Sequence, residues 1–257
     1  EMSDAAGTLL LDVTHRRWSK PVLEALDISP EILPELRESI DVCGTLTREV
    51  AEQTGLPKGI PVAGGGADNA CGATGAGIVR PGRVLSSIGS SGVIVVHTDE
   101  PQTDPQGKVH TFNHAIPSKW YVMGVIMAAG LSLKWFRDNL GHLEKQMESF
   151  SGIDAYDLMS QQAAPTSPGA EGLIFLPYLN GERTPHADAY ARGVFFGLTP
   201  RHTRGHMIRS VMEGVVYALR DSVEIIRGMG IPIQQVRAIG GGAKSPLWRQ
   251  MQADIFG

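Results

Sequence analysis

The sequence is poor in cysteine. Its 257 residues include only Cys43 and Cys71, and neither stands in a metal-ligand spacing. This excludes a zinc site built from cysteine pairs and indicates reduced thiols in a cytoplasm. Positive charge is not concentrated either, because the net charge is −4 and no basic cluster occurs. That balance argues against nucleic acid as the main partner.

Long apolar runs are also missing. The longest, Trp120 to Leu131, is well short of the roughly 20 residues that cross a bilayer, so we expect no membrane span. The acidic first residues, Glu1 and Asp4, lack the basic segment that opens a signal peptide. Position 1 is not Met, and the last residues fall inside a predicted helix. We therefore expect an internal fragment of a longer protein.

The residues that are present describe an ordinary globular α/β protein. Hydrophobic residues make up 42% and charged residues 19%, and the length suits one large domain or two smaller ones. Apolar spacing predicts helices at 19–26, 30–39, 47–55, 127–140, 206–229 and 246–256. It predicts strands at 8–13, 60–63, 120–125, 173–176 and 236–239, two strands within 83–98, and a loop at 160–170. Glycine turns at strand ends indicate that ligands bind in the crevice there.

The most informative stretch is the first glycine turn. A strand expected to be buried, 60–63, is followed by Gly64-Gly65-Gly66 and then by Asp68 and Asn69 at the start of a helix. Two interpretations of Asp68 are open. It caps the helix by accepting a hydrogen bond from the first turn. Alternatively, its carboxylate handles the proton of a substrate hydroxyl at the positive end of the helix.

A second strand–glycine–helix unit ends the chain, and residues 240–245 form its turn, Gly-Gly-Gly-Ala-Lys-Ser. Ala238 and Ala243 stand where a phosphate-binding Walker loop requires glycine, so that motif is excluded. Between the two units, the loop 89–92, Gly-Ser-Ser-Gly, joins two predicted strands. Its small residues and hydroxyls suit an anion. An ordinary hairpin turn is the alternative.

Two other patterns carry weaker signals. The histidine pairs His110/His114 and His202/His206 are each four residues apart but lack a third ligand, so we expect no metal site. The segment 178–186 is polar and rich in turn residues. It is either an exposed binding loop or a self-satisfied surface turn in which the charges carry little energy.

Taken together, these motifs resemble the FGGY family of carbohydrate kinases. The stretch 193–198, followed after a seven-residue gap by His206-Met207 and by 210–213, satisfies the second signature of that family. The turn 64–70, the segment 176–186 and the turn 240–245 stand beside it in the family's order. The resemblance implies an actin-like ATPase (ribonuclease H-like) fold, α/β, with two domains and the active site in the cleft between them.

The resemblance also implies a domain division and an activity. Residues 1–82 are expected to be the C-terminal part of a sugar-binding domain, and residues 83–257 a nucleotide-binding domain truncated at its end. The implied reaction is ATP-dependent phosphorylation of D-xylulose to D-xylulose 5-phosphate. Ribulose, gluconate and glycerol are alternative substrates, and a nucleotide-binding fragment that is inactive on its own is a further alternative.

Roles for individual residues follow from the same resemblance. Asp68 is the implied general base, and Asn69 is expected to hydrogen-bond the sugar. The implied nucleotide contacts are Gly89, Ser90 and Ser91 on the terminal phosphates, which Mg²⁺ bridges; Gly130 and Lys134 nearby; and Gly241, Gly242 and Ala243 on the adenosine side, where missing side chains let the base and ribose approach. The family's usual Gly-Thr-Ser-Gly loop is Gly-Ser-Ser-Gly here, which keeps the hydroxyl. The expected partners are a sugar and ATP, in the cytoplasm, without nucleic acid or membrane, and a homodimer is left open.

Overall fold

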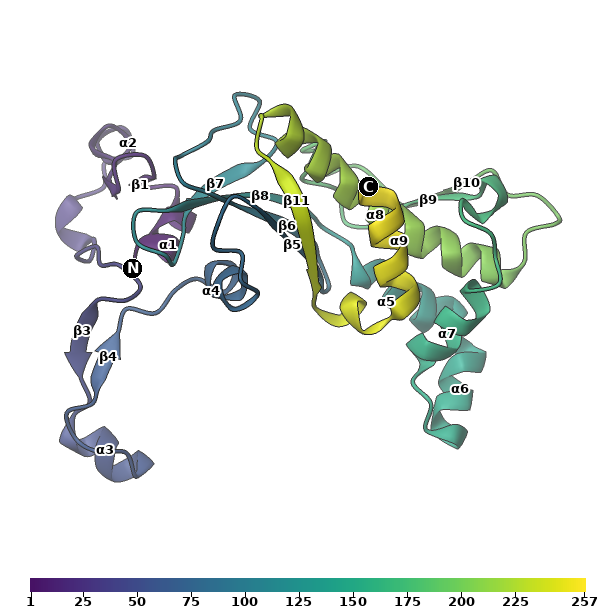
Figure 1. Cartoon of the computed structure of the whole chain (residues 1–257), viewed down its shortest axis with the longest axis horizontal. Coiled ribbons are helices and arrows are strands. Elements are labelled where there is room, and N and C mark those ends of the chain that lie inside the picture. The colour runs from purple at the N-terminus through teal and green to yellow at the C-terminus, as the bar shows by residue number, and fades with distance from the viewer. The chain divides into compact units, whose positions relative to one another are not determined.

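The computed structural model describes all residues from 1 to 257, and the chain forms two compact units. Unit 1 comprises residues 1–83, 95–103 and 110–122, and unit 2 comprises residues 84–94, 104–109 and 123–257. Three strands supply residues to both units: β5 (Gly82–Ile88), β6 (Gly92–Thr98) and β8 (Trp120–Ile126). They belong to a five-stranded sheet with the order β11-β5-β6-β8-β7 (Figure 1).

The strands of this sheet form where the sequence is rich in β-branched and aliphatic residues. Every residue of β6 and of β8 is buried, and so are most residues of β5. Strands covered on both faces show such continuous apolar runs instead of an alternating pattern. The two predicted strands within 83–98 and the strand at 120–125 are thereby confirmed. The edge strands are β7 (His110–Asn113) and β11 (Ile233–Ile239).

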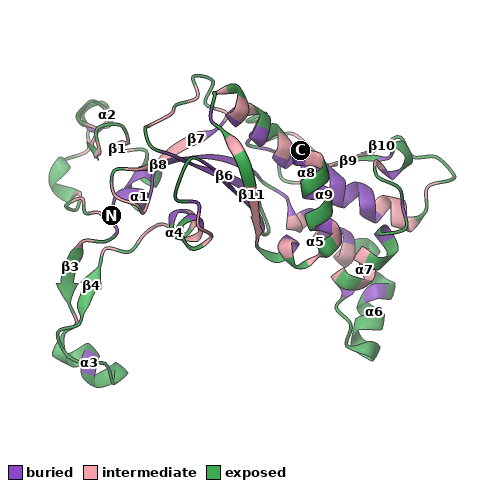
Figure 2. Cartoon of the chain, viewed as in Figure 1, coloured by how far each residue is buried: buried purple, intermediate pink, exposed green.

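Unit 1 is built from short elements. Its small core contains Met2, Ala5, Ala6 and Leu11, with Phe112 packed against it. The antiparallel pair β3–β4 is exposed along its length, as its green colour in Figure 2 shows. Besides β7, the elements of unit 1 are α1 (Met2–Ala5), β1 (Leu11–Asp12), β2 (Arg17–Trp18), α2 (Lys20–Ala25), β3 (Val42–Thr45), α3 (Arg48–Thr54), β4 (Pro61–Ala63) and α4 (Asp68–Gly75).

Unit 2 is organised around one long helix, α8 (Arg204–Gly228), which carries a continuous buried face from Ile208 to Ile226. This helix packs against α9 (Pro246–Phe256), in which Trp248 donates its indole N–H to the Met212 carbonyl of α8 at 3.0 Å. The remaining elements of unit 2 are α5 (Gly130–Leu140), α6 (His142–Ser151), α7 (Ala155–Ala163), the antiparallel pair β9 (Ile174–Leu176) and β10 (Val194–Phe196), and the 3₁₀ turn η4 (Gly241–Lys244). No helix in the chain combines the length and the apolar character needed to cross a membrane.

One local prediction was wrong and three were confirmed only in part. Residues 30–39 form only a 3₁₀ turn, Pro30–Ile32, because Pro34 forces Leu33 into the extended region, with φ −89° and ψ 137°. The predicted strand at 8–13 is reduced to β1, since Leu9 adopts a left-handed φ of 64°. The expected loop at 160–170 begins inside α7. The strand at 60–63 exists as β4, but it is not buried, and Val62 is 45% exposed.

Candidate active site

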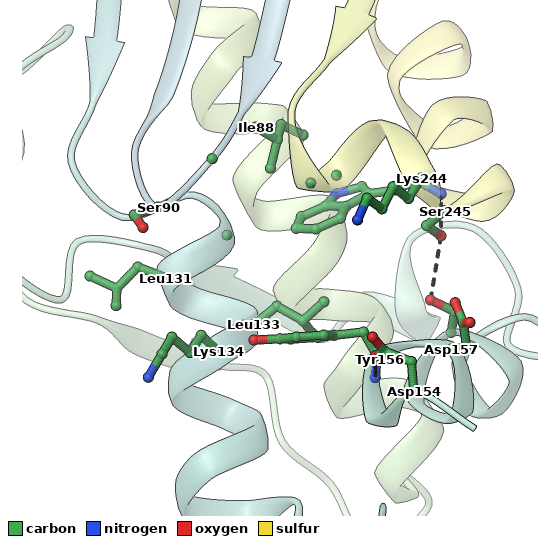
Figure 3. A pocket seen from close by; sticks show the side chains of 16 residues that line it. Ile88, Ser90, Leu131, Leu133, Lys134, Asp154, Tyr156, Asp157, Lys244 and Ser245 are labelled. Carbon is green, nitrogen blue, oxygen red and sulfur yellow. Dashed lines mark hydrogen bonds between the residues drawn. The ribbon is translucent and has the colours of Figure 1, made fainter. Parts of the chain in front are cut away.

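A cavity of about 470 Å³ lies within unit 2, a volume typical of small-molecule sites. Four segments meet there: the β5–β6 loop, the start of α5, the first turns of α7, and the turn between β11 and α9. Figure 3 shows Ser90 and Leu131 on one side, with Lys244 and Ser245 on the other. The residues whose side chains line the cavity include Leu131, Leu133, Lys134, Asp154, Tyr156, Asp157, Ser160, Lys244, Ser245 and Trp248.

Six of the eight residues predicted to contact the nucleotide line this one cavity. They come from three separate segments: Gly89 and Ser90, Gly130 and Lys134, and Gly241 and Gly242. The other two, Ser91 and Ala243, are not among the lining residues. The structure therefore gathers most of the predicted set at one place, and the roles of the individual residues stay a prediction.

The β5–β6 loop is fixed to the start of α5 by backbone hydrogen bonds. The Ser90 carbonyl accepts from the N–H groups of Ala129 and Leu131 at 2.9 and 3.1 Å, and the Gly89 carbonyl accepts from Gly130 at 2.8 Å. These bonds satisfy the two loop carbonyls with donors from α5. Carbonyl oxygens that are already paired repel an incoming anion less than free ones do, so the arrangement suits a loop that faces phosphate.

The turn after β11 packs on the end of β5. A Cβ added at Gly242 would lie 2.6 Å from the Ile88 Cβ, whereas one added at Gly241 would meet only the Ile88 carbonyl oxygen, at 3.9 Å. At Gly242 the missing side chain therefore allows close packing against Ile88, and its role beside the base and ribose stays a prediction. Gly241 keeps the open space that such an approach requires.

The charges that line the cavity are not equally available. The Lys134 ammonium lies 2.6 Å from Asp138 Oδ2, so its charge is already paired. Hydrogen bonds from Lys134 and then from Arg137 lower the pKa of Asp138 to about 2, which keeps that partner ionised. Lys244, by contrast, has no carboxylate partner at ion-pair distance. The cation available to a bound anion is thus Lys244.

Sequence reasoning missed the residues that α7 and the β11–α9 turn bring to the cavity. Asp154 caps α7, and its Oδ1 accepts the Tyr156 N–H at 2.7 Å. Ser160 of α7 and Ser245, the cap of α9, lie 3.3 Å apart through their hydroxyls (dashed in Figure 3). An Asp followed by Asp157 in the first turn is an N-terminal helix signal that could have located α7. No sequence signal places α7 against the β11–α9 turn.

The segment Glu182-Arg183-Thr184 supports the end of β8, from which the chain enters α5. Glu182 is 3% exposed, and its Oε1 accepts the N–H groups of Met127 and Arg183 at 2.9 and 2.7 Å. Thr184 pairs with both backbone groups of Val125, at 3.0 and 3.1 Å. Burial raises the pKa of Glu182, and its second carboxylate oxygen has no hydrogen-bond partner. Both interpretations of this segment, an exposed loop and a weakly held surface turn, are therefore wrong for Glu182.

In unit 1, Asp68 is the first residue of α4 and lies exposed. The N-cap is Ala67, which makes no side-chain capping bond, so the interpretation of Asp68 as the cap is wrong. One carboxylate oxygen, Oδ1, accepts the N–H of Asn69 at 2.7 Å. Asn69 itself is half-buried. The position leaves the Asp68 carboxylate accessible at the N-terminal end of α4.

The turn before Asp68 is held by polar contacts. The Ala67 N–H donates to the Ser3 hydroxyl at 2.9 Å, and the Gly65 N–H donates to the Ser39 carbonyl at 3.1 Å. The hydroxyls of Ser3 and Ser39 both donate to the carboxylate of Glu1. Burial, and then the negative charges of Asp68 and Glu1, raise the pKa of Tyr121.

The donors in the cavity fit a magnesium ion that arrives with a nucleotide. Mg²⁺ takes oxygen ligands and is usually bound through one or two carboxylates together with substrate phosphates. Asp154, Asp157 and the Ser90 hydroxyl are oxygen donors of that kind in the cavity lining. The chain contains no group of three or more His, Cys, Asp or Glu side chains that could hold a metal ion without such help.

The chain belongs to the FGGY family of carbohydrate kinases. Its residues 1–75 match the N-terminal domain of that family, and residues 84–257 match the C-terminal domain. Among curated relatives, it is similar to the xylulose kinase of Bacillus subtilis (strain 168), with 46% identity over 256 residues. That match covers 100% of this chain and 49% of the relative. The chain thus spans about half the length of the curated relatives it matches.

Two further likenesses bear on fold and substrate. The crystal structure of xylulose kinase from Rhodospirillum rubrum superposes with a TM-score of 0.81 at 34% identity, over 96% of this chain and 48% of that one. The gluconokinase of Bacillus subtilis (strain 168) is 34% identical over 258 residues, which is 100% of this chain and 50% of the relative. The expected actin-like ATPase fold is confirmed by the solved FGGY kinases, and the relatives differ in the sugar their names specify.

Proposed function

We propose that this chain is part of an ATP-dependent sugar kinase that converts D-xylulose to D-xylulose 5-phosphate. The observation that carries the proposal is the single cavity lined by six residues of the predicted nucleotide set, in a chain of the FGGY family. The xylulose kinase relative at 46% identity supports the choice of sugar. The gluconokinase relative at 34% identity favours gluconate as the second candidate.

In the proposed reaction, Asp68 accepts the proton of the sugar hydroxyl as that oxygen attacks the terminal phosphate of ATP. Phosphoryl transfer depends on alignment and charge neutralisation, so one positioned carboxylate is sufficient as the base. The exposure of Asp68 on its glycine turn supports this role, and the half-buried amide of Asn69 is available to orient the sugar. The reaction requires the Asp68 carboxylate and the phosphate to meet at one substrate hydroxyl.

The nucleotide end of the proposal uses the cavity of unit 2. Gly89 and Ser90 would hold phosphate oxygens. Lys244 would supply the positive charge, because Lys134 is already paired with Asp138. Mg²⁺, when bound with ATP, would neutralise part of the phosphate charge at the Gly89–Ser90 loop, where the Ser90 hydroxyl is an available oxygen donor. Residues that exclude water around the transferring group would limit the wasteful hydrolysis of ATP.

The division into a sugar-binding part, 1–82, and a nucleotide-binding part, 83–257, belongs to the same proposal. It is supported by the family matches, which end at residue 75 and resume at residue 84. A cytoplasmic location is also proposed. The two thiols, Cys43 and Cys71, support it because both are free and exposed.

The proposal is tested by measuring ADP release from ATP over a panel of D-xylulose, D-ribulose, D-gluconate and glycerol. We expect D-xylulose to give the highest kcat/KM. A higher value with gluconate would keep the mechanism and change the substrate. ADP release that is equal with and without every sugar would contradict a sugar kinase.

A further inference from the structure

Two aromatic side chains line the cavity, Tyr156 from α7 and Trp248 from α9. Aliphatic residues such as Leu131 and Leu133 extend this apolar part of the lining. A flat heterocycle gains from such a wall because its π face stacks on an aromatic ring, whereas a polyphosphate gains nothing from it. The aromatic part of the cavity lining therefore suits the base of a nucleotide. It differs chemically from the Gly89–Ser90 loop, which suits phosphate.

Tyr156 is supported on one face by a cation. The guanidinium carbon of Arg137 lies 4.7 Å from the centroid of the Tyr156 ring, well within cation–π range. Tyr156 lines the cavity and Arg137 does not, so the guanidinium occupies the side of the ring that is turned away from the cavity. The other face is left for a ligand. In Figure 3 the ring is seen nearly edge-on, across the open space from Lys244 and Ser245.

Arg137 is itself held in a fixed plane. Its Nε and Nη2 both donate to Asp138 Oδ1, at 2.9 and 2.7 Å, while Asp138 Oδ2 takes the Lys134 ammonium. A guanidinium that is bonded through two nitrogens cannot rotate freely. At the other end, the N–H of Tyr156 is fixed to the Asp154 carboxylate at 2.7 Å. Both the ring and its support are therefore in place before a ligand binds.

We propose that Tyr156 is the wall on which the nucleobase stacks and that Arg137 is its positioning residue. The inference rests on the proposed function, because it takes the ligand of this cavity to be a nucleotide. Removing the Tyr156 ring weakens the binding of any ligand that carries the base. Removing Arg137 weakens the same ligands less, since the ring remains but loses its fixed orientation.

The test measures the dissociation constants of adenosine, ADP and inorganic tripolyphosphate by calorimetry on the wild-type protein and its variants. For Tyr156→Ala we expect adenosine and ADP to bind about tenfold more weakly. Tripolyphosphate binding is expected to be unchanged. Tyr156→Phe keeps the ring and should stay within about twofold of the wild type. Tyr190→Ala is the matched control, because Tyr190 is 85% exposed and lies outside the cavity lining.

Arg137→Ala is expected to weaken the binding of adenosine and ADP about threefold and to leave the binding of tripolyphosphate unchanged. A general loss of structure would not produce this selectivity. If Tyr156→Ala does not fold, Tyr156→Leu keeps much of the volume without the ring and should show the same selective loss. Wild-type ADP affinity in both Tyr156→Ala and Tyr156→Leu would overturn this inference and leave the proposed function standing. A wild-type protein that binds neither adenosine nor ADP would overturn both.

Discussion

Gly65 in the first glycine turn and Gly240 in the second have nearly the same backbone angle, with φ of 78° and 79°. Their surroundings differ. A Cβ added at Gly65 would have no atom within 4 Å, whereas a Cβ added at Gly240 would lie 2.7 Å from the Ile88 carbonyl oxygen. Gly65 therefore stands in open space, whereas Gly240 packs against the end of β5.

The strands before the two turns differ in the same way. β4 pairs only with β3, and all three of its residues are exposed, while β11 is an edge of the five-stranded sheet. The first turn is held by hydrogen bonds to Ser3 and Ser39, and the second by packing on Ile88. A polar network holds an accessible carboxylate in place, whereas close packing builds the wall of a cavity. The same sequence pattern thus serves two purposes.

The largest expected effect is a difference in stability between glycine substitutions in the two turns. Gly240, with ψ −172°, lies in a region that is essentially reserved for glycine, and Gly240→Ala also creates a backbone clash. We expect it to lower the free energy of unfolding by about 3 kcal/mol or more. Gly65→Ala should cost about 1 kcal/mol, because only the positive φ opposes it. Urea denaturation measures both, and equal losses would contradict the difference in packing.

Acid should affect the two units in opposite directions. In unit 1, burial first, and then the neighbouring His97, lower the pKa of His114 to about 4. The unfolded chain therefore binds the proton more tightly, and stability is lost as the pH falls from about 6.5 toward 4, by about 3 kcal/mol. In unit 2, burial raises the pKa of Glu182. The stability that Glu182 contributes is fully present below its ordinary pKa of 4.5 and is lost as the pH rises through its folded pKa.

Hydrogen exchange read by mass spectrometry, corrected for the intrinsic pH dependence of exchange, resolves the two units. Between pH 6.5 and 5, protection should fall in the peptides around His114 and should hold or rise in those around Glu182. His114→Asn should remove most of the pH dependence in unit 1, since an amide does not titrate. Protection that falls equally in both units would contradict the opposite signs.

A smaller effect should distinguish the two lysines of the cavity. Lys244→Ala removes the unpaired charge and should weaken ATP binding about tenfold, the scale of one charge-assisted hydrogen bond. Lys134→Ala is the matched control and should change the affinity for ATP by less than about threefold, because Asp138 already pairs with that lysine. Adenosine should bind equally well to both variants. A larger loss with Lys134→Ala would reverse the assignment.

The sequence predicted best where local signals decide the structure. α9 begins and ends at the predicted residues because Pro246 follows the capping Ser245, and α8 lies within two residues of its prediction because its apolar face is long and regular. The helix predicted at 30–39 is absent for an equally local reason, because Pro34 forces Leu33 into the extended region despite the apolar spacing. Loop and strand positions around 83–98 followed from their apolar runs.

The site was less predictable because tertiary contacts create it. Tyr156 and Trp248 line the same cavity only because α7 and α9 pack together with α8, and no local pattern reports that arrangement. The burial of Glu182 has the same origin, since its partner Met127 lies 55 residues away in the chain. The nucleotide residues Ser90, Gly130 and Gly241 were found through the family motif and not through geometry.

The role of Asp68 is tested most directly by sugar-stimulated ADP release of Asp68→Asn, together with the affinity of this variant for ATP. We expect kcat to fall at least about 100-fold, because the asparagine cannot accept the proton, while ATP affinity stays unchanged. Asp27→Asn, at an exposed position with φ 54° that asparagine tolerates, should behave as the wild type. Wild-type turnover by Asp68→Asn would contradict the role of Asp68 as the base.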